Sequence, residues 1–111
     1  MLNQVVLVGR ITKELEVENL EGNKKVGVMA LAIPRTFKNS EGEYETDFIN
    51  IQLWDSVAEN VKEYCRKGDI VGVKGRLQSR EIEKYHTKMT ITEVIAEKVT
   101  FLSSRKESEE E

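Results

Sequence analysis

The stretch with the clearest chemical character is residues 46–54 (TDFINIQLW), in which two kinds of side chain alternate. With the two-residue period of a strand, three aliphatic residues face one way, while two aromatic rings and two amides face the other. An exposed aromatic ring gains nothing from water, so the second face is unusual for a surface that is only solvated. Flat rings among polar groups suit nucleic-acid bases, which have flat faces and polar edges. The residues of this face are Phe48, Asn50, Gln52 and Trp54.

Two other arrangements explain the same pattern. The strand could be buried on both faces, or its outer face could pack against another subunit. A second feature bears on the choice, because the polar segment after Pro34 places Phe37 between Arg35 and Lys38. A ring flanked by cations predicts a second stacking platform with phosphate contacts beside it, unless Phe37 folds back onto the end of the domain.

Composition restricts the possible classes of function. With 111 residues, 39% hydrophobic and 33% charged, the chain fits one domain with a modest core. No apolar run reaches the roughly 18 residues of a membrane span, and the first residues do not resemble a signal peptide, so we expect a cytoplasmic protein. One cysteine, Cys65, and one histidine, His86, form neither an internal disulfide nor the usual four-ligand zinc site, and we expect no cofactor.

The formal net charge of −3 is unusual for a nucleic-acid binder. Residues 1–102 hold 15 Lys and Arg against 16 Asp and Glu, so this part is nearly neutral. A positive surface must therefore come from the arrangement of charges and not from their sum.

The first half of the chain predicts strands separated by short turns. Residues 4–11 and 15–20 are expected to form a strand with a bend, a turn follows at 21–24, and residues 25–33 form the second long strand. Pro34 is expected to end that strand because proline has no N–H for the ladder. A polar loop with Gly42 at its tip then leads to the aromatic strand at 46–54.

A single helix is expected after Trp54. Ser56 or Asp55 with Glu59 matches a capping box, and Lys67 with Gly68 matches a helix end. An apolar stripe at helical spacing, which would place the helix across one end of a barrel, consists of Val57, Val61 and Cys65.

The last part of the chain predicts further strands. Residues 69–77 form a strand with Lys74 and Arg76 on its outer face, where both cations could line the same groove as the aromatic rings. Residues 78–87, which include Arg80 and Tyr85, form a protruding hairpin. Residues 88–94 and 98–102 supply the last strand or two, and residues 103–111 form a short disordered acidic tail.

This order predicts an all-β fold, the OB-fold, a five-stranded Greek-key barrel with one helix between strands 3 and 4. The predicted domain covers residues 1–102. OB-folds bind oligonucleotides across one face.

Three segments resemble bacterial and phage single-stranded DNA-binding proteins. Residues 3–11 (NQVVLVGRI) resemble the opening strand of that family, residues 46–59 its third strand and helix start, and residues 64–77 (YCRKGDIVGVKGRL) its helix end and fourth strand. The resemblance covers about residues 3–102, and three motifs in the right order make it specific. It implies a homotetramer, with a dimer as the alternative.

The resemblance also implies roles for individual residues. It places Phe37, Phe48 and Trp54 at the stacking sites of the family. The cations that it places near the sugar-phosphate chain are Arg10, Arg35, Lys38, Lys67, Arg76 and Arg80.

The chain departs from the family pattern at two places. Where some members carry a further tryptophan, this chain has Ile82, so that platform is missing or has moved to Tyr85. The last residues, 109–111, are acidic without the Pro-Phe tip that recruits replication and repair proteins, which predicts weak or no tail-mediated recruitment. Such a tail is typical of a phage or mobile-element form, of a second copy in its host, or of a truncated chain.

The sequence therefore predicts a non-catalytic protein that binds single-stranded DNA without strong sequence preference, in replication, recombination and repair. The alternatives are a dimeric OB-fold protein of replication restart or plasmid maintenance, and an assembly module whose aromatic strip is a subunit interface. An enzyme such as a nuclease is disfavoured, because no cluster of carboxylates accompanies the proposed face.

Overall fold

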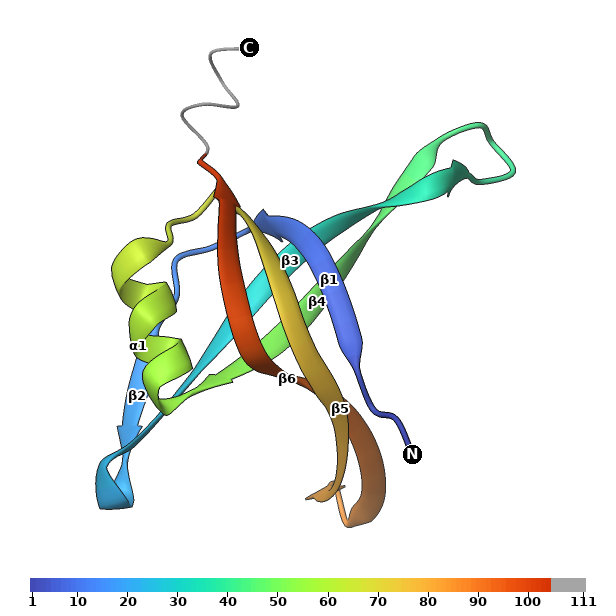
Figure 1. Ribbon diagram of the computed structural model, residues 1–111. Coiled ribbons are helices and arrows are strands. Elements are labelled where there is room, and N and C mark those ends of the chain that lie inside the picture. Colours follow the sequence, from blue (N-terminus) through green and yellow to red (C-terminus); the bar gives the residue numbers. More distant parts are fainter. Residues whose placement is uncertain (105–111) are drawn as a thin grey trace.

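Alternating apolar residues form the long strands of this protein, seen here in a computed structural model that describes residues 1–104 (Figure 1). A short 3-10 turn, η1 (Glu21–Asn23), joins the second and third strands. In chain order, the strands and the helix of the described residues are β1 (Val5–Ile11), β2 (Val17–Leu20), β3 (Lys24–Lys38), β4 (Tyr44–Trp54), α1 (Asp55–Tyr64), β5 (Ile70–Lys84) and β6 (Thr87–Ser103).

The strands form one sheet that closes on itself. Their order is β1-β5-β6-β4-β3-β2, and β1 also pairs with β3 through Arg10 with Ala32 and Ile11 with Leu31. This closure leaves β2 as an extension beyond β3, so the barrel has five strands, with α1 between the third and fourth of them. The predicted five-stranded barrel is confirmed.

The barrel interior is filled by aliphatic side chains. Leu31, Ile51, Leu53 and Val71 are completely buried, and Met29 is nearly so. Each buried side chain of this size stabilises the fold by roughly 1.5 to 3 kcal/mol relative to an exposed position. The predicted inner face of β4 is therefore confirmed at Ile51 and Leu53.

Helix α1 packs against the barrel through Ala58 and Val61, and Cys65 follows as a buried residue at the helix end. The predicted stripe is confirmed at Val61 and Cys65, whereas Val57 is only partly buried. The helix ends before the predicted position, because Cys65 is already extended.

The predicted capping box is wrong, since no side chain caps the helix N-terminus. Asp55 instead accepts a hydrogen bond of 2.9 Å from the backbone N–H of Lys25, and Glu59 pairs with the side chain of Lys25. Both acids thus tie the helix to β3.

The prediction that Pro34 ends its strand is also wrong. β3 continues to Lys38, and Pro34 pairs with Thr46 next to a shift in register. The described pairs of β1 with β3 involve Leu31 and Ala32, before Pro34 is reached, so the missing N–H of the proline costs no bond on that edge. The predicted polar loop is thereby shortened to residues 39–43.

The second half of the chain forms two very long strands. The predicted hairpin at residues 78–87 is the continuation of β5 and β6 beyond the barrel, turning at Tyr85 and His86, which have positive φ values of 52° and 62°. Figure 1 shows this hairpin projecting downward and the β3–β4 hairpin projecting to the upper right, at opposite ends of the barrel.

The predicted acidic tail begins at Ser103, which is the last residue of β6. Residues 105–111 lie outside the described residues. Within residues 1–104, no helix is long and apolar enough to cross a membrane.

Candidate nucleic-acid interface

The outer face of β3 and β4 carries the predicted aromatic strip. Directly paired residues of antiparallel strands point to the same side, so Phe48 lies beside Ala32 and Trp54 beside Val26. Because Ala32 is small, the Phe48 ring is left 70% exposed, while Trp54 is partly buried. We call this surface the aromatic face, and its residues are Phe48, Asn50, Gln52 and Trp54 of β4 with Val26, Val28, Ala30 and Ala32 of β3.

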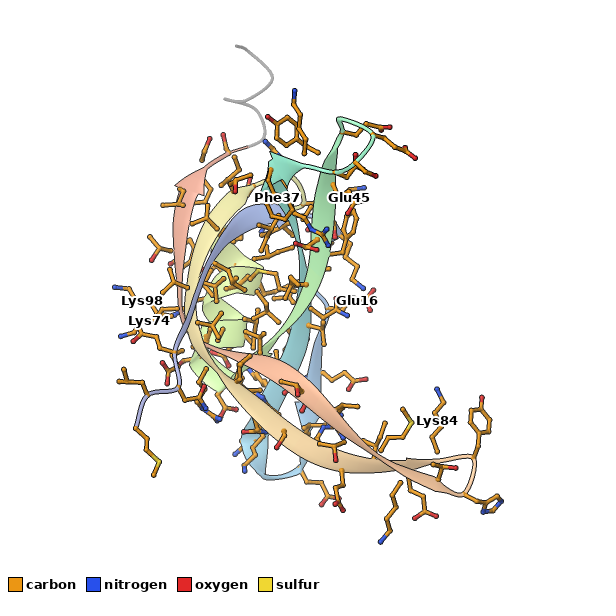
Figure 2. All side chains as sticks on the ribbon, turned by 90° about the vertical axis from the view of Figure 1, so that its right-hand side faces the viewer. Glu16, Phe37, Glu45, Lys74, Lys84 and Lys98 are labelled. Carbon is orange, nitrogen blue, oxygen red and sulfur yellow. The ribbon has the colours of Figure 1, made fainter. Side chains whose placement is uncertain are left out.

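The β3–β4 hairpin and the β5–β6 hairpin extend beyond the two ends of the aromatic face. Figure 2 shows Phe37 and Glu45 on the β3–β4 hairpin at the top, and Lys84 near the tip of the β5–β6 hairpin at the lower right. The Phe37 ring is 65% exposed and is not folded back into the core. At the other tip, Tyr85 is exposed and the Lys84 ammonium lies 5.6 Å from the centre of its ring.

Arg10 lies in the same row as Phe48, because both residues pair with Ala32. Its guanidinium donates a hydrogen bond of 2.7 Å to the carbonyl oxygen of Gly68. That bond uses one terminal nitrogen and turns the side chain toward the start of β5, so Ala32 of β3 separates the exposed Arg10 from the Phe48 ring.

Arg76 and Arg80 lie along the β5–β6 hairpin. The guanidinium of Arg76 donates to the amide oxygen of Gln78 at 2.9 Å, and the Nε of Arg80 donates to Glu93 at 2.8 Å. Residues 76, 78 and 80 alternate along β5 and so share one face. The structure therefore places both arginines on a common surface.

Two predicted cations lie elsewhere. Lys74 is paired with Lys98 on β6, and Figure 2 shows these two side chains together on the side opposite Lys84. Lys74 thus lies between Val6 of β1 and Lys98 of β6 and not beside the aromatic rings. Lys67 is exposed in the connection from α1 to β5, where its backbone N–H bonds to Glu14.

Arg35 is the predicted cation with the most internal partners. Its Nη2 donates to Asp47 at 2.8 Å, its Nη1 donates to Glu45 at 2.6 Å, and its Nε lies 3.2 Å from both oxygens of Asp47. The hydrogen bond to Asp47 raises the pKa of Arg35, and the same bond lowers the pKa of Asp47. These bonds join the two strands at the base of the β3–β4 hairpin. All donor nitrogens of the Arg35 guanidinium are therefore already bonded within the hairpin, and binding a phosphate would require breaking one of these bonds.

Lys38 lies near the tip of the same hairpin. Its ammonium lies 5.7 Å from the centre of the exposed Tyr44 ring, so the β3–β4 hairpin carries a second ring besides Phe37.

Acidic residues border the aromatic face on the β2 side. Glu18 pairs with Val26, so it lies in the row of Trp54. A hollow of about 520 Å³ lies here, lined by Lys13, Glu14, Glu16, Glu18, Val26, Gly27 and Val28. This border is not predictable from the sequence, because the pairing of β2 with β3 cannot be read from charges alone.

Glu93 is a further acidic residue near the aromatic face that is not predicted from the sequence. Its carboxylate accepts hydrogen bonds from the amide of Gln52 and from Arg80, while the amide oxygen of Gln52 accepts from the indole N–H of Trp54 at 3.1 Å. The side chain of Glu93 is only 13% exposed. The parallel pairing of β4 with β6 creates this contact, and no spacing along the sequence indicates it.

Comparison with known proteins identifies close relatives. The single-strand binding protein family model matches residues 2–102. "Single-stranded DNA-binding protein 2" of Staphylococcus aureus (strain Mu50) is 47% identical over 106 residues, which cover 95% of this chain and 75% of that protein. "Single-stranded DNA-binding protein B" of Bacillus subtilis (strain 168) is 42% identical over 106 residues, covering 95% of this chain and 94% of that protein.

A solved structure agrees with both the fold and the family. It is that of a Plasmodium falciparum SSB in complex with single-stranded DNA, with a TM-score of 0.81 and 29% sequence identity. The similarity covers 93% of this chain and 96% of that chain. The closed barrel, the family model and these relatives agree, and the chain belongs to the single-strand binding protein family.

Proposed function

We propose that this protein binds single-stranded DNA with little sequence preference and coats it during replication, recombination and repair. The observation that carries the proposal is the open aromatic face, on which Phe48 is largely exposed and Trp54 is held by a hydrogen bond, in a chain of this family. Contiguous exposed apolar surface of this kind marks an interaction site.

Binding would combine stacking with phosphate contacts. Phe48, Trp54 and Phe37 offer ring faces to successive bases, at about 1 to 3 kcal/mol per stacked base. Arg10, Arg76 and Arg80 would supply positive charge near the path of the backbone, Lys38 would add charge at one margin, and the Tyr85 ring would lie at the other. Because every base has a ring face, this mode tolerates any sequence.

Binding is proposed to be the whole activity of the chain. Within residues 1–104, no group of three or more His, Cys, Asp or Glu is placed to hold a metal ion. Incubation of single-stranded DNA with the protein and Mg²⁺ should leave the DNA intact, and protein-dependent cleavage that survives repurification would contradict this part of the proposal.

The proposal is tested by fluorescence anisotropy of a 5′-labelled oligo(dT) in the presence of wild type or Phe48→Ala. Loss of one stacking platform should weaken binding by about 1 to 3 kcal/mol. Tyr64→Ala is the matched control, since Tyr64 is 68% exposed on α1, away from the aromatic face. Equal binding by all three proteins would contradict the role of the face. Duplex DNA and oligo(rU) of the same length measure the preference for single strands and for DNA.

We also propose that the chain assembles as a homotetramer in the cytoplasm. The proposal is supported by an exposed apolar strip on the outer face of β1, β5 and β6, where Val6 and Val8 are 69% and 53% exposed and Leu102 lies nearby. Pairing through this strip would leave the aromatic face open. Light scattering after gel filtration distinguishes a tetramer from a dimer, and a monomer at all concentrations would contradict the proposal.

A further inference from the structure

A chain of hydrogen bonds crosses three strands on the side of the barrel that carries the aromatic face. It runs from the Trp54 indole on β4 to Gln52, then to Glu93 on β6, and ends at Arg80 on the β5–β6 hairpin. It therefore joins a predicted stacking ring to a predicted phosphate contact through Glu93, an acidic residue that is not among the predicted binding residues.

The chemistry of the groups fixes the direction of each bond. The indole N–H can only donate, and an ionised carboxylate can only accept. Gln52 must therefore turn its amide oxygen to Trp54 and its NH₂ to Glu93. An acceptor at position 93 is required to hold Gln52 in this orientation, and hence to keep a partner for the indole.

Glu93 also determines which nitrogens of Arg80 are available to bind a phosphate. Its carboxylate accepts a hydrogen bond from the Nε of Arg80, both terminal nitrogens have no hydrogen-bond partner among the described residues, and the Arg80 side chain is 53% exposed. Arg35 shows the opposite arrangement, since Nε and both terminal nitrogens are bonded to Asp47 and Glu45. Arg80 can therefore offer a two-nitrogen fork to a phosphate without giving up Glu93.

We infer that Glu93 is a positioning residue for single-stranded DNA, which orients Trp54 through Gln52 and aims the terminal nitrogens of Arg80 at the phosphate chain. The inference rests on the proposed function, and it adds a carboxylate that assists the binding of a polyanion. It also explains a nearly buried acid at this place on the binding side.

The sign of the mutational effect distinguishes this role from a simple charge effect. A carboxylate that acted only through its charge would repel phosphates, so its removal would tighten binding and steepen the dependence on salt. Loss of a positioning residue instead weakens binding. Because the Arg80 contact is then lost, the salt dependence becomes shallower although the protein has become more positive.

The experiment compares the affinity of wild type, Glu93→Ala and Glu93→Gln for labelled oligo(dT) over a range of salt concentrations. Glu93→Ala should bind about three- to tenfold more weakly, as expected for the net loss of one ordinary hydrogen-bond contact. Glu93→Gln should lie between the two, because its oxygen still accepts one of the two bonds. Glu97→Ala and Glu97→Gln are matched controls, since Glu97 is an exposed acid of β6 without a polar partner among the described residues; they should bind as wild type or slightly tighter.

A double-mutant cycle with Arg80→Ala tests the route of the effect. In the Arg80→Ala background, Glu93→Ala should reduce the affinity for oligo(dT) less than it does in wild type, because the Arg80 side chain that Glu93 positions is already absent. Thermal unfolding shows whether each variant is folded, and Glu93→Gln, which keeps the size of the side chain, carries the test if Glu93→Ala unfolds.

Two failures are distinguishable. Wild type that does not bind oligo(dT) would overturn the proposed function itself. Wild type that binds, with folded Glu93→Ala and Glu93→Gln binding as tightly or more tightly, would overturn only the positioning role of Glu93.

Discussion

Replacement of Gly75 by alanine should weaken the barrel at the base of the β5–β6 hairpin. Gly75 pairs with Ala96 next to a shift in register between β5 and β6. A Cβ at this position would lie 2.2 Å from the carbonyl oxygen of Ile95 and 3.1 Å from its carbonyl carbon. Because these are backbone atoms of a paired strand, they cannot rotate aside as a side chain would, so the strands must separate.

The expected magnitude is the balance of two effects. Overpacking costs about 1 to 3 kcal/mol, whereas Gly→Ala stabilises a compatible site by about 0.4 to 1 kcal/mol through the unfolded chain. A contact of 2.2 Å places Gly75→Ala at the upper end of the cost, so we expect a net loss of about 2 kcal/mol after the gain from the unfolded chain is subtracted. Gly72 provides the control, since a Cβ there would meet only side chains, at 3.6 Å from Leu102 and 4.0 Å from Val8.

Urea unfolding followed by circular dichroism measures both free energies of unfolding. Gly72→Ala should unfold at the same urea concentration as wild type or a slightly higher one, and Gly75→Ala at a clearly lower one. Identical midpoints for the two variants would refute the assignment of Gly75 to a close backbone contact.

Three further predictions concern the charges and the thiol. Arg80→Ala should reduce the magnitude of the slope of log affinity against log salt by about 0.7, the value for one lost phosphate contact on single-stranded DNA. Arg35→Ala should leave this slope unchanged and lower Tm. Equal slopes for both variants would contradict the distinction between the two arginines. The hydrogen bond from Arg35 lowers the pKa of Asp47, so its stabilising effect is present above the ordinary carboxyl pKa of about 4 and is lost as pH falls through the lowered value. Melting curves of Asp47→Asn and wild type should therefore converge at acidic pH, and a Tm difference that grows on acidification would have the wrong sign. Burial raises the pKa of the Cys65 thiol, so labelling by an aromatic disulfide should be slow in the native protein and rapid in urea, and rapid native labelling would show that the thiol is exposed.

The sequence predicts the architecture because the strands and helix differ in period. The alternation around Ile51 and Leu53 indicates which face of β4 enters the core, and that face is buried. The errors arise where local rules compete with tertiary pairing. Pro34 is compatible with a strand whose edge is free at that point, and Asp55 and Glu59 bind Lys25 instead of capping the helix.

The sequence predicts those features of the candidate site that depend on one β-strand, but not those that depend on contacts between β-strands. The outward direction of Phe48 follows from its alternation with Ile49 and Ile51, and the structure agrees. The partners of the predicted cations depend on strand pairings that bring distant segments together. The pairing of β4 with β6 brings Glu93 to Gln52, and the register of β3 with β4, in which Ile33 pairs with Asp47, brings Asp47 to Arg35.

The intrinsic fluorescence of Trp54, the only tryptophan of the chain, tests the central claim most directly. Titration with oligo(dT) at low and at high salt reports on the aromatic face itself. Quenching that saturates, and that needs more DNA at high salt, is expected if bases stack on Trp54 while cations hold the phosphates. Unchanged Trp54 emission, while labelled oligo(dT) shows saturating binding or none at all, would contradict the assignment of this face to single-stranded DNA.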